Sequence, residues 1–135
     1  MLSVSDSIIE QTISDLQQRL PFEGVGLWIG READVLDWLP LQNVAERPKV
    51  SYRVHPQEWL DALAKTQARK MVPLALVHSH PTAEAVPSLR DRQEWMYPEL
   101  WCIIVSFRSD QPVWKAYQIS LSASSSTSGA HRAHK

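Results

Sequence analysis

Residues 73–91 read PLALVHSHPTAEAVPSLRD, and the beginning of this stretch decides the fold. The run PLALVHS is apolar on both faces, which is typical of an interior strand whose sheet has layers packed on either side. Pro81 then ends the strand, and Ser88 begins a helix. The sequence therefore predicts a layered α/β domain in which polar side chains gather at the end of a central strand.

Further helices and strands alternate on both sides of this central strand. Apolar spacings of three and four residues, with prolines at helix boundaries, predict helices over residues 6–19, 56–70 and 88–97. Short apolar or alternating runs predict strands over residues 24–30, 35–41, 73–79, 100–107 and 113–119. The expected order is αββαβαββ, which indicates a mixed β-sheet flanked by helices and not a bundle or a β-sandwich.

Several apolar side chains are expected to face the core. In the second helix these are Trp59, Leu60, Leu63 and Ala64. Trp38 and Trp114 fit core-facing strand positions, and Cys102 fits a small buried thiol without a chemical role. Trp95 and Trp101 flank the end of the third helix, and one of them is a candidate for lining a substrate groove.

Length and composition describe one globular domain of 135 residues with 44% apolar and 21% charged content. The formal charge is −1 and no basic block is present, so we expect no nucleic-acid partner. A single cysteine, the absence of a secretory signal pattern and the absence of a long apolar run predict a cytoplasmic protein without membrane contact. We expect the folded domain over residues 1–121 and a disordered polar tail over residues 122–135.

The end of the central strand carries a candidate metal site. His78 and His80 are two residues apart in an extended strand, so their side chains point to the same side. Asp91 lies in the first turn of the next helix and would add a carboxylate. Two imidazoles and one carboxylate form a set that zinc accepts, with the fourth tetrahedral position left for water. Two alternatives stay open: a hydrogen-bonded histidine pair, and a helix cap formed by Ser88 and Asp91.

The spacing His-x-His, seven residues, Ser, two residues, Asp resembles the signature of the JAMM (JAB/MPN) zinc metalloproteases, here met by His78, His80, Ser88 and Asp91. The stretch PFEGVGLWIG, residues 21–30, resembles the family's upstream context and supplies Glu23. The resemblance implies that the two histidines and the aspartate bind zinc, that Glu23 is the general base and then acid, and that Ser88 stabilises the oxyanion. It also implies a cytidine-deaminase-like three-layer fold.

The resemblance further implies the reaction and its substrates. We expect a zinc-dependent peptidase or isopeptidase that uses a metal-bound hydroxide to hydrolyse amide bonds at the C-terminus of ubiquitin-like or sulfur-carrier proteins. The extended tail of such a substrate would bind along a sheet edge that leads to the metal. The alternatives are a non-catalytic MPN-type scaffold and a RadC-like nucleic-acid-associated protein. His55, His131 and His134 are left out of the expected site.

Overall fold

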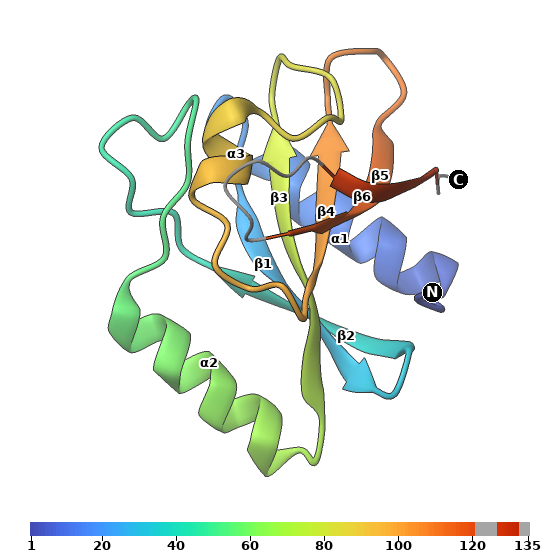
Figure 1. Ribbon diagram of the computed structural model, residues 1–135. Helices are drawn as coiled ribbons and strands as arrows, with labels where there is room; N and C mark the ends of the chain where they lie inside the picture. Colours follow the sequence, from blue (N-terminus) through green and yellow to red (C-terminus); the bar gives the residue numbers. More distant parts are fainter. Residues whose placement is uncertain (121–126, 133–135) are drawn as a thin grey trace.

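One mixed β-sheet forms the centre of the molecule. The computed structural model describes residues 1–120 and the backbone of residues 127–132. The strands are β1 (Val25–Arg31), β2 (Asp34–Leu41), β3 (Val72–His80), β4 (Trp101–Ser106), β5 (Val113–Ile119) and β6 (Thr127–Arg132). Their spatial order is β2-β1-β3-β4-β5-β6, in which β3 and β4 are parallel and every other pair is antiparallel. The predicted α/β class and central strand are therefore confirmed (Figure 1).

The sheet separates two apolar cores. The helices are α1 (Asp6–Gln18), α2 (Pro56–Ala68) and α3 (Leu89–Gln93). One core joins α1 to one face through residues such as Leu16, Trp28 and Val77, while the other joins α2 to the opposite face through residues such as Ala62 and Leu76. Figure 1 shows α1 behind the strands and α2 at the lower left. The result is the expected three-layer arrangement, and no helix among the described residues is long and apolar enough to cross a membrane.

The predicted buried face of α2 is wrong: the observed face is rotated by part of a turn about the helix axis. Ala62 and Thr66 are the buried residues of α2, whereas Leu60 is 58% exposed. Thr66 can be buried because its hydroxyl donates a hydrogen bond to the carbonyl of Ala62 at 2.7 Å. Trp59 packs against this core as expected, so α2 contacts the sheet through a stripe that includes a polar residue.

The third helix is shorter than predicted, because it ends at Gln93 and not near Tyr97. Beyond the helix the chain turns, and the indole nitrogen of Trp95 donates to the carbonyl of Tyr97 at 2.9 Å. This turn buries Trp95 in the core on the α2 side of the sheet. The predicted last turn of the helix is therefore absent, and the chain instead adopts a turn that buries the Trp95 side chain.

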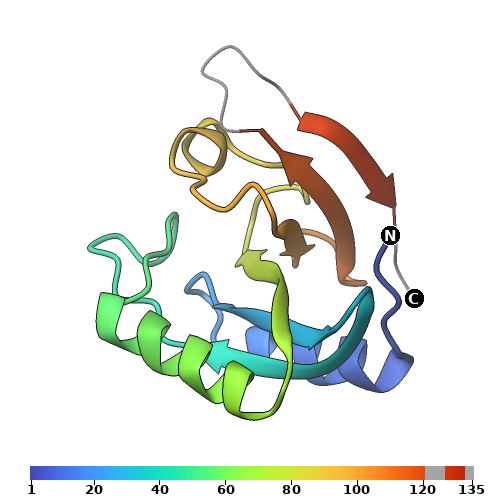
Figure 2. The same cartoon turned by 60° about the horizontal axis from the view of Figure 1, so that its bottom comes forward.

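The sheet continues into the polar C-terminal region. Residues 127–132 form β6, which pairs with β5 along the edge of the sheet (Figure 2). Backbone hydrogen bonds to an open edge do not require apolar side chains, which explains how such a polar sequence can add a strand. The remaining residues of the expected tail, 121–126 and 133–135, lie outside the described residues, as do the side chains of His131 and His134.

Candidate active site

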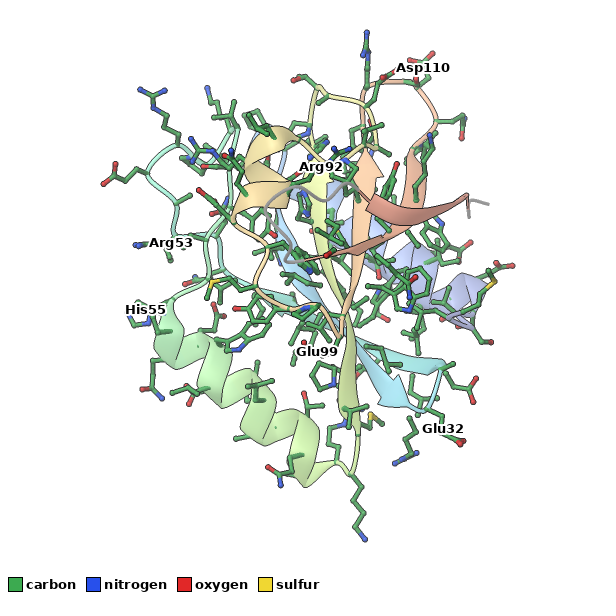
Figure 3. The ribbon with its side chains drawn as sticks, viewed as in Figure 1. Glu32, Arg53, His55, Arg92, Glu99 and Asp110 are labelled. Carbon is green, nitrogen blue, oxygen red and sulfur yellow. The ribbon has the colours of Figure 1, made fainter. Side chains whose placement is uncertain are left out.

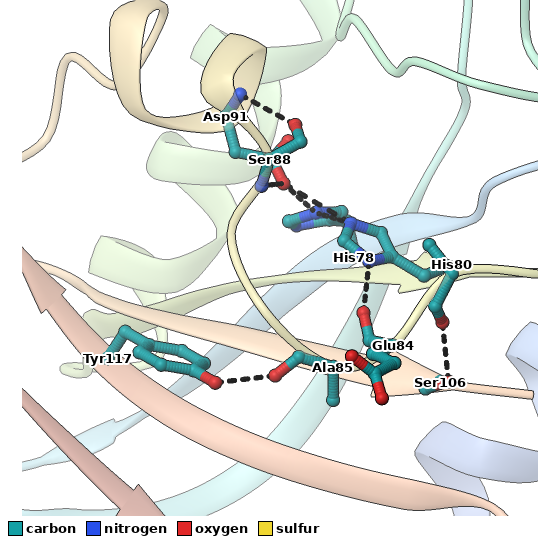
Figure 4. Close-up of polar contacts among 9 residues, drawn as sticks. His78, His80, Glu84, Ala85, Ser88, Asp91, Ser106 and Tyr117 are labelled. Carbon is teal, nitrogen blue, oxygen red and sulfur yellow. Dashed lines mark hydrogen bonds and ion pairs between the residues drawn. The ribbon is translucent and has the colours of Figure 1, made fainter. Parts of the chain in front are cut away.

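Three side-chain donor atoms, two from β3 and one from α3, lie close together. His78 Nε2 lies 3.2 Å from His80 Nε2, and Asp91 Oδ2 lies 3.3 Å from the first of these atoms and 3.2 Å from the second (Figure 4). Among the described residues, this is the group of histidine, cysteine and carboxylate side chains that could hold a metal ion. The structure therefore brings together the three residues that the sequence predicts as metal ligands.

The spacing of these atoms fits zinc. Zinc binds nitrogen and oxygen ligands at about 2.0–2.1 Å in a tetrahedron, whose ligand atoms then lie about 3.3 Å apart. The three measured separations of 3.2 to 3.3 Å correspond to one face of such a tetrahedron. Two imidazoles and one carboxylate are also a donor set that zinc accepts.

Hydrogen bonds and burial act on the protonation of the two histidines. His80 Nδ1 lies 2.7 Å from the carbonyl of Glu84, which can only accept, so Nδ1 carries a proton and Nε2 is the nitrogen left to contact Asp91 or a metal. The loop that contains Glu84 is in turn fixed by the hydroxyl of Ser106, which donates to the carbonyl of Ala83 at 2.6 Å. Complete burial lowers the pKa of His78 and outweighs its contacts with Asp91. The pKa of His80 is raised, because its hydrogen bonds to Asp91 and Glu84 outweigh the effect of burial.

Ser88 and Asp91 form a complete capping box at the start of α3. The amide of Asp91 donates to Ser88 Oγ at 3.0 Å, and the amide of Ser88 donates to Asp91 Oδ2 at 2.9 Å. The cap and the metal-ligand interpretations are therefore compatible, because the cap aims the same carboxylate oxygen at both histidines. Burial alone would raise the pKa of Asp91, but the hydrogen bonds from His78 and His80 lower it well below its ordinary range.

Glu23 lies two residues before β1, next to the candidate metal ligands. Val25 pairs with His78 in the antiparallel register of β1 and β3, so Glu23 continues along the same face of the sheet toward His80. Its side chain is buried at 6% exposure, and Oε1 has no hydrogen-bond partner among the described residues. Burial raises the pKa of Glu23 to about 7, an effect that nearby His80 opposes and Asp91 reinforces. A carboxylate with this pKa can take up and release a proton near neutral pH.

Three residues around the site escaped prediction from the sequence. The ring of Tyr52 stacks on that of His78, with 4.5 Å between the ring centroids. Asn43 donates a hydrogen bond to the carbonyl of Glu23 at 2.9 Å, and Ser79 accepts one from the amide of Gly24 at 2.8 Å. Asn43 and Tyr52 lie in irregular segments where periodicity carries no signal, whereas the position of Ser79 between the two histidines was a signal for contact with the site.

A groove of about 710 Å³ leads to Asp91. It lies between residues 51–54, α2 and residues 93–97, and its walls include Trp59 and Tyr97, whose rings stack at 4.8 Å. Trp95 also lines it, as one of the two alternatives predicted, whereas Trp101 packs on the opposite face of the sheet.

The other reactive residues have structural roles. Cys102 is buried, and burial raises the pKa of its thiol, which keeps it protonated. His55 is exposed and caps α2, because its Nδ1 accepts from the amide of Gln57 at 3.1 Å. Figure 3 shows His55 on the segment that leads into α2. Both residues therefore stay outside the candidate site, as expected.

Comparison with known proteins gives a consistent set of relatives. Residues 5–120 match the family model described as prokaryotic homologs of the JAB domain. The chain is 39% identical over 100 residues, covering 73% of its own length and 67% of the relative, to a probable TtuB-protein conjugate cleaving protease of Thermus thermophilus. It is 33% identical over 67 residues to the desampylase of Haloferax volcanii, a match that spans 50% of this chain and 48% of the desampylase.

Solved structures agree with this result. A protein of Desulfitobacterium hafniense superposes with a TM-score of 0.79 at 30% identity and covers 87% of this chain and 83% of its own. A JAB1/MPN domain protein from Archaeoglobus fulgidus superposes with a TM-score of 0.58 at 19% identity, covering 87% of this chain and 89% of its own, which shows a shared fold. With a family model matched over residues 5–120, the chain belongs to the prokaryotic JAB-domain family.

Proposed function

We propose that this protein is a zinc-dependent isopeptidase that hydrolyses amide bonds at the C-terminus of ubiquitin-like or sulfur-carrier proteins. The observation that carries the proposal is the triangle of His78, His80 and Asp91 donor atoms beside the buried carboxylate of Glu23, whose Oε1 has no hydrogen-bond partner among the described residues. The names of two relatives, a TtuB-conjugate cleaving protease and a desampylase, support the choice of protein conjugates as the substrate class.

The metal would supply the polarisation that the reaction needs. A zinc ion held by His78, His80 and Asp91 would lower the pKa of a coordinated water to about 7 and polarise the substrate carbonyl. Glu23 would accept the proton that water loses when it attacks the carbonyl carbon. It would then donate that proton to the amine nitrogen as the C–N bond breaks, which its pKa of about 7 favours.

Ser88 would stabilise the oxyanion. Its Oγ already accepts a hydrogen bond from the amide of Asp91, so the hydroxyl proton is available to donate to the substrate oxygen. Because the same residue caps α3 and orients Asp91, its position is fixed before substrate binds. Oxyanion stabilisation and ligand orientation therefore rest on one side chain.

The groove beside Asp91 would hold the extended tail of the substrate. It runs along aromatic walls to Asp91, whereas β3 lies in the middle of the sheet between β1 and β4. We therefore place the tail in this groove and not along a sheet edge. We also propose a cytoplasmic location, since Cys102 is buried without a disulfide partner, as in proteins of reducing compartments.

The decisive experiment combines metal analysis with cleavage of a carrier protein joined through its C-terminal glycine to a lysine side chain. We expect the wild type to contain about one zinc per chain and to cleave the isopeptide bond. Asp91→Ala should lose both zinc and cleavage, and Glu23→Gln should keep zinc but lose about a hundredfold or more in kcat. Glu84→Gln is the matched control, because its exposed carboxylate is removed while the carbonyl that orients His80 stays. Normal turnover by Glu23→Gln, or full zinc content in Asp91→Ala, would contradict the proposal.

A further inference from the structure

We propose that Asn43 is a positioning residue that holds Glu23 and Tyr52 in one fixed arrangement around the histidines. The proposal rests on the function proposed above and adds to it a residue outside the predicted motif. Asn43 lies just after β2, on the segment that returns toward the site before α2 begins. Its side chain connects the backbone of Glu23 to that of residues 45–53.

All the hydrogen-bonding capacity of the Asn43 amide is used. Nδ2 donates to the carbonyls of Glu23 and Ser51, each at 2.9 Å. Oδ1 accepts from the amides of Ala45 and Arg53, each at 3.0 Å. Nδ2 also lies 3.5 Å from the carbonyl of Pro48, so carbonyls surround the nitrogen and two N–H groups face the oxygen, and the orientation of the amide follows from its partners.

These bonds fix the backbone of Glu23 on both sides of its side chain. The carbonyl of Glu23 accepts from Asn43, and its amide donates to the carbonyl of Pro48 at 2.7 Å. Both partners belong to the segment 43–53. The position of the Glu23 carboxylate therefore depends on this segment as well as on β1.

The same segment carries Tyr52 to His78. Ser51 and Arg53, the neighbours of Tyr52 on either side, are both hydrogen-bonded to Asn43. Tyr52 is thereby held with its ring stacked on His78 at 4.5 Å. One side chain thus fixes both the proposed base and the ring that covers a proposed ligand.

The chemistry of the amide makes a selective test possible. Asn43→Asp keeps an oxygen that can accept from Ala45 and Arg53 but replaces both donated hydrogen bonds by contacts between oxygens. The segment retains a backbone hydrogen bond from the amide of Val44 to the carbonyl of Arg53 at 2.7 Å, which supports folding of the variant. Gln42→Glu is the matched control, because it adds a charge at the neighbouring exposed position and leaves the four bonds intact.

The test is a double-mutant cycle with Glu23→Gln, measured as kcat, KM and zinc content on the carrier conjugate. We expect Asn43→Asp to lower kcat about tenfold to a hundredfold with zinc content and KM close to wild type, and Gln42→Glu to leave kcat unchanged. In the Glu23→Gln background, Asn43→Asp should cause no further loss of kcat, because the residue acts through Glu23. An equal loss in both backgrounds, or unchanged kcat, would overturn the assignment.

Hydrogen exchange gives a readout that does not depend on catalysis. The amide of Glu23 should exchange faster in Asn43→Asp than in wild type and Gln42→Glu, because its partner segment is released. Unchanged exchange would overturn the positioning role. If Glu23→Gln proves as active as wild type while exchange at Glu23 rises in Asn43→Asp, the proposed function fails but the hold of Asn43 on Glu23 stands.

Discussion

Gly24 and Ser79 are joined by two hydrogen bonds. The amide of Gly24 donates to Ser79 Oγ at 2.8 Å, and the amide of Ser79 donates to the carbonyl of Gly24 at 3.0 Å. Gly24 follows the proposed base Glu23, and Ser79 lies between the two histidines. A Cβ atom on Gly24 would lie 2.5 Å from a methyl carbon of the buried Leu16, so a larger residue here would displace that side chain. This pair therefore fixes the distance between the proposed base, Glu23, and the two histidines.

Removal of the Ser79 hydroxyl should destabilise the protein. Ser79→Ala leaves the buried N–H of Gly24 without its acceptor, which costs about 1–3 kcal/mol in the free energy of unfolding. Urea unfolding of metal-free protein measures this value. Ser14→Ala, on the exposed side of α1, is the control and should change it by less than about 0.5 kcal/mol. Equal values for the two variants would show that the Gly24–Ser79 pair carries no stability.

The burial of Glu23 predicts a stability that depends on pH. Its pKa is raised from 4.5 to about 7, so the folded state keeps a proton that the unfolded chain releases as the pH rises through this window. Wild-type stability should therefore fall between these pH values relative to Glu23→Gln. We expect the metal-free variant to be more stable by on the order of 2 kcal/mol at about pH 8, and the difference to vanish near pH 4. Urea unfolding across this range checks the trend, which Glu84→Gln should not reproduce.

Ser88 should affect catalysis more than stability. Ser88→Ala removes the acceptor for the amide of Asp91, at a cost of about 1 kcal/mol in the free energy of unfolding. It also removes the proposed oxyanion donor, for which we expect a loss of about a hundredfold in kcat. Ser88→Thr retains a hydroxyl and should recover most of both. If kcat falls only as far as zinc content falls, Ser88 acts as a cap alone.

Two exposed apolar side chains border the groove and should contribute to substrate affinity. Leu60 is 58% exposed and Met96 is 71% exposed, so a serine at either position costs little in folding. We expect Leu60→Ser and Met96→Ser to raise KM for the carrier conjugate about threefold to tenfold, with kcat and thermal stability retained. Val72→Ser is the control, since Val72 is 51% exposed at the opposite end of β3 from the histidines. A rise in KM for the control as well would argue against groove binding.

The sequence was informative where local pattern determines structure. The apolar run of β3 predicted its central place in the sheet, and the spacing of His78 and His80 predicted their shared side. The helix that begins at Ser88 placed Asp91 near them because a cap fixes the first turn. Each of these inferences depends on residues close together in the chain.

The sequence did not predict features that depend on contacts between residues far apart in the chain. The rotation of α2 about its axis depends on how Thr66 satisfies its hydroxyl, which an apolar pattern does not report. The early end of α3 follows from the burial of Trp95 across the sheet face. Asn43 and Tyr52 act through hydrogen bonds and stacking between irregular segments, for which no periodic signal exists.

The central position of β3 in the sheet has a consequence for the binding and release of a metal ion. The strand is paired along its length to β1 on one side and β4 on the other, and both apolar cores contain its side chains. Its geometry is thus secured by the polypeptide itself, unlike a zinc finger, in which the cation organises the chain. Removal of the metal by a chelator should therefore abolish the proposed activity while the protein stays folded. Another divalent ion such as cobalt should then bind at the same site without refolding of the chain.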